Sequence, residues 1–173
     1  LLLAAGLIAY ATGGGAPPAV QSVAETAESE SSQVWKQRAW WLVCAFVPSS
    51  LLVGCTTYLA TDVASAPFLW ALPLILYISS FIIVFSKSPA ISLATSSRLL
   101  PAAIAVAILV LNGSAGIPLF IGLIGNLLVL LLAALVGHGM LAEDRPEASR
   151  LTEFYLVMSL GGVLGGAFNA LLA

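Results

Sequence analysis

The sequence predicts an all-α protein, a polytopic integral membrane helix bundle, and the first reason is its composition. Of its 173 residues, 60% are hydrophobic and 8% are charged, and the mean hydropathy is +1.06. A soluble domain carries about a quarter charged residues, so this chain has too few to cover a water-facing surface. Its apolar runs are also far too long for barrel strands. We therefore expect about five full transmembrane helices plus one truncated at the N-terminus.

The N-terminal part divides into a short apolar run and a polar segment. Residues 1–12 are apolar but would extend only about 18 Å as a helix, against a hydrocarbon core of about 30 Å. We interpret this run as the end of a truncated transmembrane helix. Residues 13–39 contain three consecutive glycines, the pair Pro17–Pro18 and three glutamates. This composition predicts a flexible, acidic cytoplasmic linker.

The remaining residues, 40–173, form the predicted transmembrane bundle. Trp40, Trp41 and Tyr58 lie at the two ends of its first apolar run, where aromatic side chains suit the membrane interfaces. The third run is the shortest and reaches across only if Arg98 snorkels to the interface. Spans are expected near residues 40–60, 68–86, 97–114, 117–141 and 154–173.

All six basic residues fall on one side of this predicted topology. The opposite loops contain none, so the positive-inside rule assigns the shared side to the cytoplasm. Losing or adding one span would scatter these charges over both sides. No basic run is present to follow a phosphate backbone, which argues against a nucleic-acid partner. The cytoplasmic loops carry Lys36 and Arg38, Lys87 and Arg98, and Arg145 and Arg150.

Polar residues gather at the predicted outer end of the first full span. Asp62 is the only acidic residue on that side of the membrane. The cluster predicts either interfacial solvation and helix capping or an outward-facing polar pocket for a cation. Its members are Thr56, Thr57, Tyr58, Thr61 and Asp62.

Pro48 falls near the middle of the same span and predicts a kink, because proline removes one backbone donor. Ser49 and Ser50 can then satisfy the carbonyl groups that this leaves free. A kinked helix can line a substrate path or serve as a static bend, and the sequence leaves both open.

Four glycines in the last span resemble a nucleotide-binding loop, but no strand precedes them. At helical spacing they form two GxxxG rows, Gly161 with Gly165 and Gly162 with Gly166. Such rows let the backbone of a neighbouring helix approach closely. We expect them to pack helices, with a small-molecule contact as the alternative.

His138 and nearby carboxylates are the remaining candidates for chemistry. With Glu143, Asp144 and Glu153, His138 can bind a metal or relay a proton, or these groups can simply solvate the membrane interface. The two glycines flanking His138 suggest a turn, and the spacing matches no metal motif. We assign no catalytic, cofactor or metal residue, and we leave open whether the complete protein is an enzyme.

Three stretches together resemble a known family. They are residues 46–62, with Phe46 to Leu51 and Thr56 to Asp62; residues 67–74; and residues 138–169. The combination resembles the membrane region of bacterial fused major-facilitator/spermidine-synthase proteins.

The resemblance implies an inner-membrane domain with further helices of the same chain as partners. It also implies a C-terminal soluble aminopropyltransferase-like domain. The membrane part would anchor this spermidine-synthase-like protein, and it would transport or sense a small cationic metabolite such as a polyamine. Two alternatives remain: a plain membrane scaffold for a cytoplasmic partner domain, and a fragment of an unrelated secondary transporter.

Overall fold

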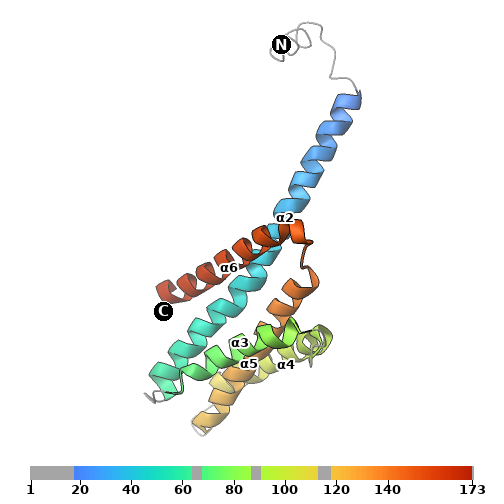
Figure 1. The fold of residues 1–173 in the computed structure, drawn as a ribbon. Coiled ribbons are helices and arrows are strands. Elements are labelled where there is room, and N and C mark those ends of the chain that lie inside the picture. Colours follow the sequence, from blue (N-terminus) through green and yellow to red (C-terminus); the bar gives the residue numbers. More distant parts are fainter. Residues whose placement is uncertain (1–17, 64–67, 87–90, 113–117, 173) are drawn as a thin grey trace. The chain divides into compact units, whose positions relative to one another are not determined.

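The computed structural model describes residues 18–63, 68–86, 91–112 and 118–172, and within these ranges the chain is helical with short connections (Figure 1). The predicted all-α class is therefore confirmed for the described part, whereas the predicted truncated helix at residues 1–12 lies outside it. A π-helical turn, η1 (Leu59–Val63), follows the first helix, and a 3-10 turn, η2 (Ala148–Arg150), precedes the last. The five α-helices among the described residues are α2 (Pro18–Tyr58), α3 (Ala71–Val84), α4 (Leu93–Asn112), α5 (Leu119–Glu143) and α6 (Leu151–Leu172).

Four helical segments in the described residues are long and apolar enough to cross a bilayer. The segment expected near residues 68–86 is not among them, because α3 has only 14 residues and is about 21 Å long. The span that the sequence predicts to be the shortest, near residues 97–114, corresponds to α4, which has 20 residues. The four long segments are Ser32–Thr61, Leu93–Val110, Phe120–Glu143 and Ala148–Leu171.

Local chemistry explains why α3 is short. A hydrogen-bonded turn precedes it, in which the Ala71 amide donates to the Phe68 carbonyl over 3.3 Å. Pro73 lies in the first helical turn, where its missing amide hydrogen would have had no partner within the helix. At the other end, the Ser86 amide donates to the Ile83 carbonyl over 3.4 Å, the tighter pattern of a terminating turn.

Helix α2 begins earlier than expected, at Pro18. Residues 18–39, which the sequence predicts to be a flexible linker, are instead the first part of this helix. Proline is favoured at the first helical position, and the segment is rich in alanine, glutamate and glutamine, which have high helix propensity. The chain divides into two compact units between Arg38 and Ala39, and the bundle described below is the second unit.

One end of this bundle, the Trp41 end, is built around a cluster of buried apolar side chains. The second half of α2, the end of α5 and the start of α6 meet there, and the Trp41 and Phe154 rings pack edge to face with centroids 5.0 Å apart. Phe85, just after α3, packs on the same cluster. Its buried members are Trp41, Cys44, Ala45, Leu141 and Phe154.

The opposite end, the Tyr58 end, has a second cluster made by Cys55, Leu59 and Leu130. Tyr58 and Leu69, which precedes α3, pack against it. Helix α4 starts with Leu93 beside Gly139, near the end of α5, and reaches Val110 beside Gly122, near its start. In the part of the chain that the structure describes, successive helices thus run in alternating directions between the two ends, along α2, α3, α4, α5 and α6.

Polar and apolar side chains are distributed in the bundle in a way that suits lipid. The buried polar residues among those described are Ser80, Ser96 and His138, each at most 1% exposed. Large apolar side chains are exposed along α3, α4 and α6, for example Ile82 at 68% and Leu109 at 72%. Many large exposed apolar side chains of this kind are typical of contact with a membrane or a partner.

Candidate functional site

Two hydroxyl groups of the predicted polar pocket bind carbonyl groups of the preceding helical turn. Thr56 Oγ1 donates to the Leu52 carbonyl over 2.7 Å, and Thr61 Oγ1 donates to the Thr57 carbonyl over 2.9 Å. Both hydrogens are therefore used, and the threonine oxygens remain available as acceptors. The side chain of Asp62 lies outside the described residues.

A cavity of about 270 Å³ lies beside part of this cluster. Thr56 and Thr57 line it, whereas Tyr58 and Thr61 are not among its described lining residues. Tyr58 instead lies beside α5, where a Cβ atom at Gly122 would come within 3.2 Å of its hydroxyl. Apart from the two threonines, the described lining is apolar or aromatic: Leu52, Val53, Trp70 and Leu74.

Pro48 is buried inside α2 and faces α5. Because proline has no amide hydrogen, the Cys44 carbonyl loses its usual donor one turn later. Helix α5 approaches closely at this point, since a Cβ at Gly137 would lie 2.6 Å from the Cys44 oxygen and 2.7 Å from Pro48 Cγ. The interruption of α2 thus coincides with a close approach to α5.

The two serines after Pro48 bind the neighbouring helix rather than α2 itself, which differs from the sequence expectation. Ser49 Oγ donates to the Gly162 carbonyl of α6 over 2.7 Å. Asn169 Nδ2 of α6 donates to the Ser50 carbonyl over 2.9 Å and reaches Ser50 Oγ at 3.3 Å. These side chains connect α2 with α6, and interhelical bonds of this kind hold helices together in lipid.

The two glycine rows of α6 have different surroundings. A Cβ at Gly161 would lie 2.5 Å from the Leu42 carbonyl oxygen, and one at Gly165 would collide with the Phe46 carbonyl. At Gly162 a Cβ would meet nothing within 4 Å, and at Gly166 its nearest neighbours are at 3.8 Å. The close approach of α6 to α2 therefore runs along the row of Gly161 and Gly165.

A buried polar centre joins α3 to α5 at His138. The sequence suggested a turn at this residue, but His138 lies within α5, roughly 8 Å before its end, and is fully buried. Its Nδ1 atom is 2.8 Å from Ser80 Oγ, which in turn is 2.6 Å from the Tyr77 carbonyl oxygen. The Phe81 ring stacks on the imidazole with centroids 3.5 Å apart.

This geometry assigns the tautomer of His138. A carbonyl oxygen only accepts, so the single hydroxyl hydrogen of Ser80 goes to Tyr77, and Ser80 Oγ must accept from His138 Nδ1–H. The Nε2 atom then carries a lone pair. It is buried and has no hydrogen-bond partner among the described residues. The centre can accept one further hydrogen bond at Nε2.

Two of the carboxylates near His138, Asp144 and Glu153, interact with other side chains. Trp41 Nε1 donates to Asp144 Oδ2 over 2.5 Å, and Glu153 Oε2 pairs with Arg150 Nε at 3.2 Å. In the part of the chain that the structure describes, no three His, Cys, Asp or Glu side chains lie close enough to hold a metal ion. The described residues therefore offer no metal centre for His138.

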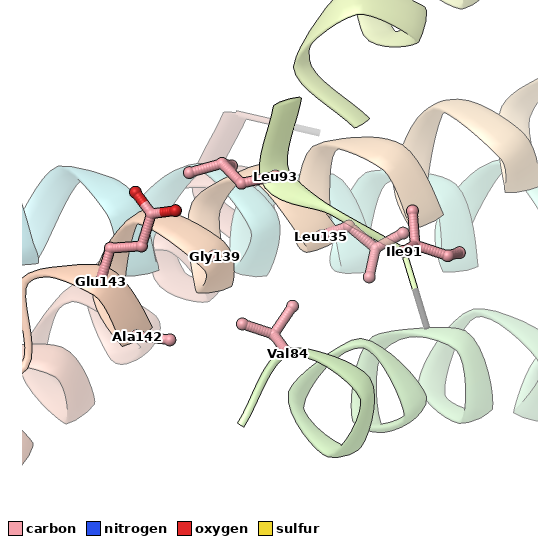
Figure 2. Close-up of a pocket in the computed structure, with 7 residues that line it drawn as sticks. All are labelled: Val84, Ile91, Leu93, Leu135, Gly139, Ala142 and Glu143. Carbon is pink, nitrogen blue, oxygen red and sulfur yellow. The ribbon is translucent and has the colours of Figure 1, made fainter. Parts of the chain in front are cut away.

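Two cavities flank the end of α3. One, of about 210 Å³, lies between α3, α5 and the start of α4, and Figure 2 shows Glu143 beside its apolar wall of Val84, Ile91, Leu93, Leu135, Gly139 and Ala142. The other, of about 420 Å³, lies toward α6 and contains Arg145. Its other lining residues are Phe81, Ile82, Phe85, Tyr155 and Met158.

Comparisons with known proteins give no further guide to these sites. A scan of protein-family models, a search of curated proteins and a search of solved structures each found no match.

Proposed function

We propose that residues 39–173 are a multi-pass membrane domain that anchors a spermidine-synthase-like protein in the bilayer. The observation that carries the anchoring role is the distribution of side chains. Four membrane-length segments carry large apolar groups outward, whereas Ser80, Ser96 and His138 point into the bundle. In lipid, exposing apolar surface carries no free-energy penalty, and buried polar groups form their hydrogen bonds between helices.

The alternating course of the helices supports the proposed orientation. Arg145 and Arg150 lie between α5 and α6 at the Trp41 end, and Arg98 lies in the second turn of α4, which starts at the same end. Lys36 and Arg38 precede Trp41 in the sequence. We propose that this end is cytoplasmic, as the positive-inside rule requires.

The residues that carry the family resemblance also favour anchoring over transport. Four motif residues of α2 contact α5 or α6, and Asn169 of α6 donates a hydrogen bond to the carbonyl of one of them, Ser50. The four are Phe46, Pro48, Ser49 and Ser50. These motif residues make contacts between helices. Their placement suits a rigid membrane support.

The experiment is cysteine labelling in a background that lacks Cys44 and Cys55, both of which are buried. Single cysteines replace Ser32, Ser92, Asn112 and Ser149, which are all exposed. A membrane-impermeant maleimide should label Asn112→Cys from outside intact cells and the other three only in inverted vesicles. Since α2 contains a membrane-length segment, Ser32 and Ser92 share a side only if the short segment around α3 also crosses the membrane.

Two results would contradict the proposal. Labelling of Ser32→Cys and Ser92→Cys from opposite sides would mean that α3 does not cross. Release of the parent chain from membranes by alkaline carbonate would remove the anchoring role itself.

A second candidate function, binding of a small cation such as a polyamine, is favoured by the cavity beside Thr56 and Thr57. Trp70 lines this cavity, and a tryptophan face attracts an ammonium group. The threonine oxygens supply acceptors for its hydrogens. Asp62 follows in η1 and is the carboxylate that the sequence places nearest to this cluster.

A further inference from the structure

The cavity between α3 and α6 combines one cationic side chain with an apolar wall. Arg145 lies in the short connection between the two membrane-length segments that end at Glu143 and begin at Ala148. The bilayer core ends where such segments end, so this connection lies at the depth of the lipid headgroups. No ion-pair partner of Arg145 is found among the described residues.

The rest of the cavity extends from this connection toward the bilayer core. Phe85 and Phe81 are one helical turn apart and stack with centroids 6.0 Å apart. On α6, Tyr155 and Met158 continue the wall to about 15 Å from Ala148. Tyr155 also brings a hydroxyl group, and Ile82 is 68% exposed at the side of the cavity.

We propose that this cavity binds an anionic phospholipid, with the headgroup phosphate on Arg145 and one acyl chain along Phe81, Ile82 and Met158. A guanidinium group binds phosphate through two parallel hydrogen bonds. Basic pockets between transmembrane helices recognise anionic headgroups in this way. The site goes beyond anchoring, but it rests on the proposed membrane location.

The shape of the charge distribution selects a lipid over a soluble anion. A soluble phosphate compound needs donors around most of its oxygens once it leaves water. This cavity offers Arg145 and Tyr155, and its other described lining residues are apolar. A phospholipid matches both parts, because its charge and its hydrocarbon lie at opposite ends.

The test is native mass spectrometry of the full chain in detergent, titrated with phosphatidylglycerol or phosphatidylcholine. The parent should bind the anionic lipid about tenfold more tightly, the size of one charge-assisted hydrogen bond. In Arg145→Gln this preference should disappear. In Arg145→Lys it should fall only partly, because lysine keeps the positive charge but cannot form the two parallel hydrogen bonds of a guanidinium group. The matched control is Arg98→Gln, which removes an exposed arginine of α4 outside the cavity and should keep the tenfold preference.

Two further arms locate the site and identify the ligand. Met158→Trp should fill part of the cavity beside its apolar wall and so weaken the binding of both lipids. Glycerol phosphate, which has no acyl chains, should fail to compete at concentrations where phosphatidylglycerol saturates.

Three results would overturn the proposal: an unchanged preference in Arg145→Gln, unchanged binding in Met158→Trp, or competition by glycerol phosphate at equal concentration. Thermal unfolding without added lipid checks that each variant is folded. If the chain resists carbonate extraction but shows no lipid preference, only the lipid site fails, and the anchoring role stands.

Discussion

Replacing Gly161 with alanine tests the contact between α2 and α6 with a change of one methyl group. A Cβ at this position would lie 2.5 Å from the Leu42 carbonyl oxygen, 3.2 Å from the Leu42 carbonyl carbon and 3.0 Å from the Ala45 Cβ. Two of these atoms belong to the backbone of α2 and cannot rotate away. Because favourable contact distances begin near 3.5 Å, the helices must separate by roughly 1 Å.

The neighbouring residue Gly162 provides a matched control, since a Cβ there meets nothing within 4 Å. Each substitution replaces a glycine inside the same helix, so the gain in helix propensity, up to about 1 kcal/mol, applies to both. The difference between the two variants is then the overpacking cost at Gly161, about 1–3 kcal/mol. We expect Gly161→Ala to be less stable than Gly162→Ala by this amount.

The measurement is the free energy of unfolding in mixed detergent micelles, followed by tryptophan fluorescence. Trp41 packs on Phe154 across the same pair of helices, so its emission should report their separation. Gly165→Ala, which collides with the Phe46 carbonyl, should behave like Gly161→Ala. Equal stability of the Gly161→Ala and Gly162→Ala variants would refute the assignment of the close contact to the row of Gly161 and Gly165.

Two other substitutions probe the polar groups of the bundle. Ser80→Ala removes the acceptor of His138 Nδ1–H and should lower the free energy of unfolding by about 1–2 kcal/mol. The control is Ser97→Ala, which should have little effect because the Ser97 hydroxyl bonds only within α4. Equal losses in the two variants would contradict an interhelical role for Ser80. Asp62→Asn should weaken polyamine binding to the chain in vesicles if the cation proposal is right, with Glu147→Gln at the other end of the bundle as control. Identical binding by the parent and a folded Asp62→Asn variant would leave anchoring as the single function proposed.

The helical class and the approximate helices could be predicted from the sequence because they depend on local composition. Long apolar runs must satisfy their backbone groups internally, and only helices do this within one segment. The positions of α5 and α6 follow from such runs. The short length of α3 was missed, because Phe68, Leu69 and Trp70 extend the apolar run before the helix begins.

The start of α2 was missed for a related reason. Residues 18–39 are polar, and polarity predicts the absence of a packed core rather than the absence of a helix. Their alanine and glutamate content favours a helix by propensity alone, a signal that the three glycines and Pro17 before residue 18 obscured.

The sequence by itself determined that glycines spaced by four would lie on one face of the last helix, and that His138, the single histidine, lies close to the end of an apolar run. Only the tertiary structure decided that the row of Gly161 and Gly165 faces α2 and that His138 meets Ser80. The physical reason is that helical periodicity specifies which residues share a face but not which neighbour that face meets. The rotation of α6 against α2, and of α5 against α3, depends on contacts such as Phe46 with Gly165 and Phe81 with His138, which join residues far apart in the chain.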